Sequence, residues 1–149
     1  MSIYNKIIDI QKLGQAWDRV RKNKPVCGVD NVTYDMFEEN RREELKQLNL
    51  ELTEHRYESL PVRLSKIYKE EKVRTIAIFS MRDKVVQQSL AHELSRLYEP
   101  FFSKSTFAYR QGQSALAALD LIEEQVKSRD SLWVLKMDIA DFFDHIRHE

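Results

Sequence analysis

The stretch LWVLKMDIADFFD, residues 132–144, decides the fold expected of this chain. Its first six residues are mostly apolar, which predicts a short strand over residues 132–137 that is buried on both faces. The strand ends at Asp138, so an acid stands at its carboxyl edge. A single strand is not stable alone, and the sheet that it should join is not found elsewhere in the chain. We therefore expect the sequence to be truncated, with the partner strands encoded beyond Glu149.

Upstream of this stretch the sequence predicts helices and one hairpin, an α+β arrangement. Two strands, over residues 61–68 and 73–79, flank the polar run KEEK, which has the length of a hairpin tip. Period two places Arg74 in line with Ile76 and Ile78 on one face of the second strand. Apolar residues at helical spacing predict helices over residues 4–22 with a break near Gly14, 33–54, 81–97 and 114–126.

The composition excludes several classes of protein. Hydrophobic residues make up 42% and charged residues 32%, a globular balance. No stretch approaches the ~18 apolar residues of a membrane span, and we find no secretory signal, so we expect a cytoplasmic protein. Cys27 is the only cysteine, which leaves neither an intrachain disulfide nor a cysteine metal cluster. The histidines lack zinc spacing, and no phosphate-binding glycine loop occurs.

The charge is unevenly distributed along a chain whose formal net charge is zero. Residues 56–84 hold eight Lys or Arg against four acids, whereas residues 38–54 are rich in acids. Such a basic segment is compatible with a local phosphate-binding face. It is equally typical of an ordinary solvated hairpin, and the residues alone leave both interpretations open.

Two places could carry chemistry. Asp138 and the backbone carbonyl of Ile139 offer the oxygen ligands that Mg²⁺ prefers, although phosphoryl transfer with two metals needs at least one further acid. The spacing Asp-x-x-Asp-x-x-Asp is also typical of polar residues that cap a helix. Lys69 and Arg74 flank the hairpin tip and could bind a triphosphate, with Arg forming bidentate hydrogen bonds to phosphate oxygens.

Six motifs in one order resemble bacterial reverse transcriptases of the group II intron and retroelement type. Single motifs are weak, but their shared order is specific. The resemblance covers roughly Gly28 to the end of the chain. The motifs are GVDNVTY (28–34), similar to "GVDGVT"; RY (56–57) with PVR (61–63); IYK (67–69) with KVRTIAI (72–78), similar to "IPK…GK-x-RPLGIP"; RDKVVQQ (82–88), similar to "RDRIVQQ"; FAYRQGQSA (107–115), similar to "YGFRPGRSA"; and DIADFFDHI (138–146), similar to polymerase motif A.

The resemblance implies an RNA-directed DNA polymerase, a nucleotidyltransferase that extends a DNA or RNA primer with dNTPs on an RNA template. It implies helix-rich fingers with a β-hairpin over residues 29–113, preceded by a helical segment over 1–28. Residues 114–149 are then the beginning of the palm, including its first strand. Intron RNA or another structured RNA is an expected further partner. We expect the fragment itself to be inactive, because one carboxylate cannot hold two metals.

The resemblance also implies a role for each candidate site residue. Asp138 and the Ile139 carbonyl bind the catalytic metal, Mg²⁺ or Mn²⁺. Phe143 is the steric gate that favours dNTPs. The triphosphate is bound by the hairpin, and further cations lie on the template path together with the Gly28 motif. The hairpin residues are Lys69 and Arg74, and the template-path cations are Arg63 and Arg110.

Several departures from the family pattern keep two other functions open. Glu70 and Glu71 stand where the family has glycine at the hairpin tip, and Gln111 and Gln113 replace a proline and an arginine. The family's aromatic-x-Asp-Asp acids are absent from the sequence. One alternative is a non-catalytic RNA-binding scaffold on a degenerate polymerase fold. The other is a template-independent polymerase of the defence type.

Overall fold

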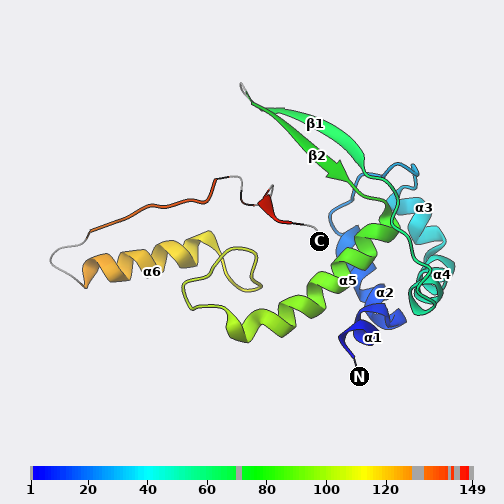
Figure 1. Ribbon diagram of the computed structural model, residues 1–149, viewed down its shortest axis with the longest axis horizontal. Helices are drawn as coiled ribbons and strands as arrows, with labels where there is room; N and C mark the ends of the chain where they lie inside the picture. Colours follow the sequence, from blue (N-terminus) through cyan, green and yellow to red (C-terminus); the bar gives the residue numbers. More distant parts are fainter. Residues whose placement is uncertain (1, 70–71, 129–132, 141, 143–144, 148–149) are drawn as a thin grey trace. The chain divides into compact units, whose positions relative to one another are not determined.

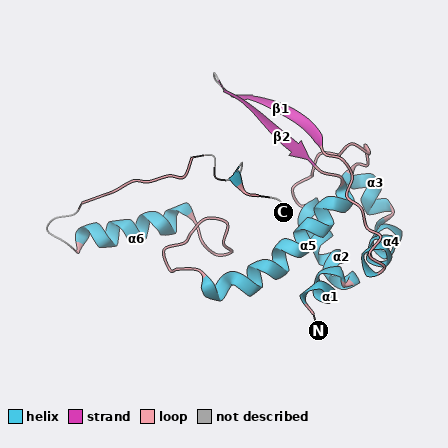
Figure 2. Ribbon diagram, viewed as in Figure 1, coloured by secondary structure: helices cyan, strands magenta, loops and turns pink. Residues whose placement is uncertain are grey.

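The computed structural model describes residues 2–69, 72–128, 133–140, 142 and 145–147, with the side chains of Lys69 and Lys72 outside the description. The chain divides into two compact units, residues 1–101 and 102–149. Helices and a two-stranded antiparallel sheet make up the described part (Figure 2), which confirms the α+β class. None of the described helices combines the length and the apolar character that a bilayer span requires.

The first two helices are α1 (Ile3–Ile8) and α2 (Ile10–Arg21). The chain breaks at Asp9, whose carboxylate accepts hydrogen bonds from the N–H groups of Gln11 and Lys12 at 3.0 and 3.1 Å. The predicted break near Gly14 is therefore wrong. Gly14 lies buried within α2. The interruption falls at Asp9 instead, because its side chain caps the first N–H groups of α2.

The predicted helix that starts after Thr33 is two helices, α3 (Tyr34–Glu39) and α4 (Arg41–Thr53). Thr33 caps α3 as expected, since its Oγ1 accepts a hydrogen bond from the N–H of Met36 at 3.2 Å. The helix ends at Asn40, whose side-chain amide donates to the Met36 carbonyl at 3.1 Å. This hydrogen bond supplies a partner for a carbonyl at the end of α3.

Helix α5 (Met81–Tyr98) runs through the centre of the first unit and continues into the short helix η1 (Glu99–Phe101). Of the apolar residues at helical spacing over 81–97, Leu90 and Leu97 are 39% and 43% exposed. The buried residues are Met81, Asp83, Val85, Ser89 and Glu93, and all but Asp83 recur at a spacing of four.

The buried polar residues of α5 are accommodated by partners on other helices. Ser89 Oγ donates to the carbonyl of Ile7 at 2.7 Å. The Glu93 carboxylate lies 3.7 Å from Lys12 Nζ. The hydrogen bond offsets the cost of burying the Ser89 hydroxyl. Glu93 Oε1 is buried without a hydrogen-bond partner in the described part of the chain, and only the charges of Lys12 and Arg96, at 3.7 and 3.6 Å, offset its burial.

The core of the first unit lies where α1, α2, α4 and α5 meet (Figure 1). Trp17 and Phe37 are at its centre, with ring centroids 4.3 Å apart. Both are almost completely buried, and burying two large aromatic side chains contributes several kcal/mol of hydrophobic stabilisation. The remaining core members are Ile8, Leu13, Ala16, Leu45, Leu48, Leu52, Met81 and Val85.

Strands β1 (Arg63–Lys69) and β2 (Lys72–Ile78) form the predicted hairpin, which projects from the helices (Figure 1). The register runs from Arg63 opposite Ile78 at the base to Lys69 opposite Lys72 near the tip. The apolar side chains near the tip face solvent: Tyr68 is 74% and Val73 is 57% exposed. Helical packing therefore supports the hairpin mainly at its base.

The second unit contains α6 (Ala115–Lys127), which confirms the helix predicted over 114–126. Ser114 caps it, since its Oγ accepts a hydrogen bond from the N–H of Ala117 at 3.1 Å. The apolar stripe of α6 is exposed, with Leu116 at 67% and Ile122 at 58%. The predicted first palm strand is not formed by its described residues, which run as an exposed coil from 133 to 137. A strand needs a hydrogen-bonded neighbour, and the only described sheet is the hairpin. Leu132 lies outside the described residues.

Candidate functional site

The hairpin carries two of the predicted site residues on one face. Arg63 pairs with Ile78, and Arg74 pairs with Ile67. Directly opposed residues of an antiparallel pair project to the same side, and alternation places Ile67 on the same side as Arg63. Arg63 and Arg74 therefore share a face, four register positions apart, or roughly 13 Å along the strands.

The two arginines differ in their surroundings. Arg74 is exposed near the outer end of the hairpin, whereas Arg63 is half-buried at its base. Lys69 has its backbone in β1 opposite Lys72, but its side chain lies outside the described residues. On this face the described hairpin presents one cation to solvent near its tip and a second, partly enclosed cation near the helices, while the exposed Lys66 lies on the opposite face.

A second basic side chain lies close to Arg63 at the base of the hairpin. Burial lowers the pKa of the Lys84 ammonium, and the positive charge of Arg63 lowers it further, while Cys27 and Asp30 act in the opposite sense. Lys84 Nζ donates a hydrogen bond to the carbonyl of Val26. The loop that carries the Gly28 motif is therefore tied to the first turn of α5.

Gly28 itself packs directly against the backbone that joins the hairpin to α5. A Cβ at this position would lie 2.7 Å from Ser80 Cα and 2.9 Å from the carbonyl carbon of Phe79. This approach is closer than any side chain allows, so glycine is required by contact. The motif that the resemblance places on the template path is, in this structure, a packing surface for the hairpin base.

A hydrogen-bonded cluster that sequence reasoning missed lies beside Gly28. Asp83 accepts hydrogen bonds from the Tyr57 hydroxyl at Oδ1 and from Ser80 Oγ at Oδ2, the latter at 2.7 Å. Its backbone N–H donates to Ser80 Oγ at 3.1 Å. Asp83 is 2% exposed, and burial, followed by the hydrogen bond and negative charge of Asp83, raises the pKa of Tyr57. The signal available was the RDKVVQQ motif, whose second residue is Asp83.

Asp138 lies in the second unit, where the structure leaves it exposed. Its Oδ1 accepts a hydrogen bond from the N–H of Ile139 at 3.0 Å, and Ile139 is 69% exposed. Among the described residues, no group of three or more His, Cys, Asp or Glu could hold a metal ion. One carboxylate and one carbonyl fit part of a Mg²⁺ coordination shell, but they do not make a two-metal site.

Arg110 is engaged by its own loop. Its Nη1 donates to the carbonyls of Ser103 and Thr106 at 2.9 and 2.7 Å. The guanidinium also lies 5.3 Å from the centroid of the Phe102 ring, within the range of a cation–π interaction. Arg110 therefore shapes the loop 103–110. Phe143, the predicted steric gate, lies outside the described residues.

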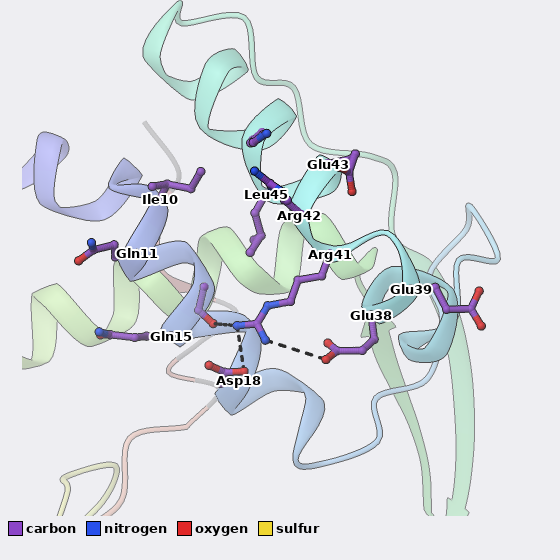
Figure 3. Close-up of a pocket in the computed structure, with 12 residues that line it drawn as sticks. Ile10, Gln11, Gln15, Asp18, Glu38, Glu39, Arg41, Arg42, Glu43 and Leu45 are labelled. Carbon is purple, nitrogen blue, oxygen red and sulfur yellow. Dashed lines mark hydrogen bonds and ion pairs between the residues drawn. The ribbon is translucent and has the colours of Figure 1, made fainter.

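An open cleft of about 590 Å³ lies between α2, α3 and α4 (Figure 3). Arg41 points into it and ion-pairs with Asp18 at 3.1 Å and Glu38 at 3.9 Å. Its guanidinium also donates to the carbonyl of Gly14 at 3.4 Å. The cleft contains no residue of the predicted site, and its central cation is already paired with carboxylates of the chain.

Comparison with known proteins identifies the family. Residues 67–149 match the model of the reverse transcriptase (RNA-dependent DNA polymerase) family. Over 125 residues the chain is 28% identical to protein YkfC of Escherichia coli (strain K12), covering 81% of this chain and 33% of YkfC. It is 30% identical over 137 residues to the group II intron-encoded protein LtrA of Lactococcus lactis subsp. cremoris, covering 89% of this chain and 22% of LtrA.

A further match is the putative COX1/OXI3 intron 2 protein of Saccharomyces cerevisiae (strain ATCC 204508 / S288c). It is 26% identical over 143 residues, which cover 94% of this chain and 16% of the relative. The chain spans about a third of the length of YkfC and about a fifth of LtrA. The family match includes β2, α5, α6 and Asp138. The chain therefore belongs to the reverse transcriptase family, with group II intron-encoded proteins among its relatives.

Proposed function

We propose that this chain supplies the fingers and the beginning of the palm of an RNA-directed DNA polymerase. Residues 29–113 are assigned to the fingers and 114–149 to the palm, with 1–28 as a helical segment in front of them. One observation carries the proposal: the segment that matches the family, residues 67–149, holds both the exposed Arg74 on the hairpin and the exposed Asp138. In this proposal Arg74 binds phosphate and Asp138 binds a metal ion, and both residues lie in the segment that matches the polymerase family.

The hairpin is assigned to the incoming nucleotide. Arg74 is exposed and offers the planar fork of donors that suits phosphate oxygens, and Lys69 is assigned to the same triphosphate. Arg63, about 13 Å nearer the base on the same face, is too far along the strands to share one phosphate with Arg74. It is therefore assigned to the template path. Arg110 is assigned there as well, through the loop that it holds in shape.

Asp138 and the Ile139 carbonyl are assigned to the divalent metal, Mg²⁺ or Mn²⁺. When bound, the metal ions stabilise charge on the attacking and leaving oxygens of the phosphoryl transfer. The exposed carboxylate of Asp138 offers oxygens to a metal, but the sequence contains no adjacent pair of aspartates to complete the site. We therefore propose that the 149-residue chain alone is inactive. Phe143 is assigned to the steric gate against a ribose 2′-hydroxyl.

The experiment that tests this function is primer extension by the polymerase that contains this chain. The expected product on an RNA template is DNA of template-defined length, formed only with dNTPs and a divalent metal. Synthesis without any template would instead support a template-independent polymerase. Binding of structured RNA with no synthesis would support the scaffold function. The 149-residue chain, assayed in parallel, is expected to incorporate no nucleotide.

A further inference from the structure

The segments that flank the β-hairpin are joined by a hydrogen bond between Tyr57 and Asp83. Tyr57 precedes β1, and Asp83 follows β2 in the first turn of α5. The Tyr57 hydroxyl donates to one oxygen of Asp83, and Ser80 Oγ donates to the other at 2.7 Å. Each carboxylate oxygen therefore has a donor from a different side of the hairpin.

These hydrogen bonds lie in a place where their loss is costly. Ser80 and Asp83 are 1% and 2% exposed, and an uncompensated charge at such depth is strongly unfavourable. Burial and then Asp83 raise the pKa of Tyr57, so its hydroxyl keeps the donated proton well above neutral pH. The connection between the two hairpin ends is thus held in one arrangement.

The loop that carries Gly28 packs against the backbone beside Ser80 and Asp83. The backbone of Ser80 approaches Gly28 so closely that an added Cβ would lie at 2.7 Å. Lys84, one residue beyond Asp83, donates to the carbonyl of Val26. We name the four residues Gly28, Tyr57, Ser80 and Asp83 the hairpin clamp.

Apart from the hairpin clamp, few contacts among the described residues fix the direction in which the strands leave the helices. Ile67, Tyr68 and Val73 are 48%, 74% and 57% exposed, so the outer half of the hairpin is not packed on the described helices. Arg74 lies roughly 13 Å from the base of the ladder at Ile78. At that distance a rotation of about 10° at the base moves the Arg74 backbone by roughly 2 Å, and misplacement by ~1 Å can cost ~100-fold in rate.

We propose that the hairpin clamp positions the nucleotide-binding hairpin, and that its four residues set the affinity for the incoming dNTP without touching it. This inference rests on the proposed function of Arg74. The clamp residues are positioning residues: they fix the direction in which β1 and β2 leave the helices. Removal of the Tyr57 hydroxyl should leave the hairpin folded but allow it to swing.

The swing can be measured in the 149-residue chain by pulsed electron paramagnetic resonance. Spin labels at Thr75→Cys on β2 and Lys46→Cys on α4, in a Cys27→Ala background, report the direction of the hairpin. Tyr57→Phe is expected to broaden the distance distribution, while the β1–β2 amides stay protected from hydrogen exchange. The matched control is Tyr34→Phe, because Tyr34 also packs half-buried against the core.

Two results would overturn the inference. One is a distance distribution in Tyr57→Phe as narrow as in Tyr34→Phe. The other is loss of hydrogen-exchange protection in β1 and β2, because Tyr57 would then hold the hairpin together instead of orienting it. A readout on the chain alone keeps this test separate from polymerase activity.

The functional consequence is tested in the polymerase that contains the chain. Tyr57→Phe is expected to raise KM for dNTP about tenfold. Tyr4→Phe removes a hydroxyl that donates to the Leu52 carbonyl at 2.5 Å and is expected to leave KM within twofold. An unchanged KM in an active Tyr57→Phe enzyme contradicts the positioning role alone. Absence of activity in the unmodified enzyme contradicts the proposed function, while the spin-label experiment still decides whether the hairpin clamp orients the hairpin.

Discussion

Two glycines of this chain are predicted to respond in opposite directions to the same substitution. Gly28→Ala places a Cβ 2.7 Å from Ser80 Cα and N. Gly14→Ala places one 3.7 Å from Arg41 Nη2 and 3.9 Å from Leu45 Cδ1, which are ordinary contacts. Neither glycine has a positive φ angle, so strain of a left-handed backbone contributes to neither substitution.

The magnitudes follow from the distances. Ordinary van der Waals contact begins near 3.4 Å, so Gly28→Ala requires the Ser80 backbone to move by about 0.7 Å, the difference from 2.7 Å. Ser80 caps α5 and bonds to Asp83, so the shift disturbs both, and overpacking of this kind costs about 1–3 kcal/mol. Gly14 lies inside α2, where Ala is favoured over Gly by roughly 0.5–1 kcal/mol.

The assay is urea unfolding followed by the fluorescence of Trp17. Trp17 is fully buried in the core of the first unit, whereas Trp133 is 100% exposed. A Trp133→Phe background therefore restricts the signal to the core. Gly28→Ala is expected to lower the urea midpoint and Gly14→Ala to raise it, with an unchanged slope m. An unchanged midpoint in Gly28→Ala, or a midpoint in Gly14→Ala below that of Gly28→Ala, would refute the reasoning.

Three further predictions concern other parts of the chain. Burial alone would raise the pKa of Glu51, but a hydrogen bond from Gln47 and the charge of Arg82 outweigh it, so the net pKa is lowered from 4.5. The free energy of unfolding should therefore fall as pH falls below about 4.5, and Glu51→Gln should flatten this dependence in the same range in urea titrations. In the active polymerase, Arg74→Ala should raise KM for dNTP at least tenfold, whereas Lys66→Ala should not, because Lys66 lies on the opposite face of the hairpin. Equal effects of the two substitutions in steady-state kinetics would contradict nucleotide binding by the face that carries Arg74. Ile122→Ser should change the stability of the 149-residue chain by less than about 0.5 kcal/mol, since Ile122 is 58% exposed; a large loss of α6 helicity by circular dichroism would show that the stripe is covered in solution.

Local patterns predicted the hairpin and most helix ends well. Alternation of residue types marked both strands, and a polar oxygen marked the starts of α3 and α6 at Thr33 and Ser114. These signals work because the hydrogen bonds that they imply join residues two to four positions apart. The break falls at Asp9 and not at Gly14, because a side-chain cap starts a new helix whereas a single glycine only weakens one.

The buried face of α5 could not be predicted in the same way. Ser89 and Glu93 are polar, yet they are buried because Ile7 and Lys12 provide partners from distant parts of the sequence. Apolar residues therefore mark only the first part of the buried face, at Met81 and Val85. The described residues of the strand predicted over 132–137 run as a coil, because strand formation depends on a neighbour that local sequence does not supply.

The candidate site shows the same division between local and distant information. Alternation placed Arg74 on a face of β2, but only the register showed that Arg63 shares that face. The hydrogen bond between Tyr57 and Asp83 joins residues 26 positions apart, and each looks ordinary in its own segment. Resemblance to a family identified the motif that contains Asp83, whereas the hydrogen bonds of Asp83 with Tyr57 and Ser80 are visible only in the folded structure.

The most direct test of the central claim is RNA-templated primer extension after substitution of Asp138 in the polymerase that contains this chain. Asp138→Ala is expected to abolish synthesis, because it removes the proposed metal-binding carboxylate. Asp120→Ala is the matched control, since Asp120 is an exposed aspartate on α6 of the same unit, and it should retain synthesis. Undiminished synthesis by Asp138→Ala would contradict the assignment of Asp138 as the catalytic metal ligand.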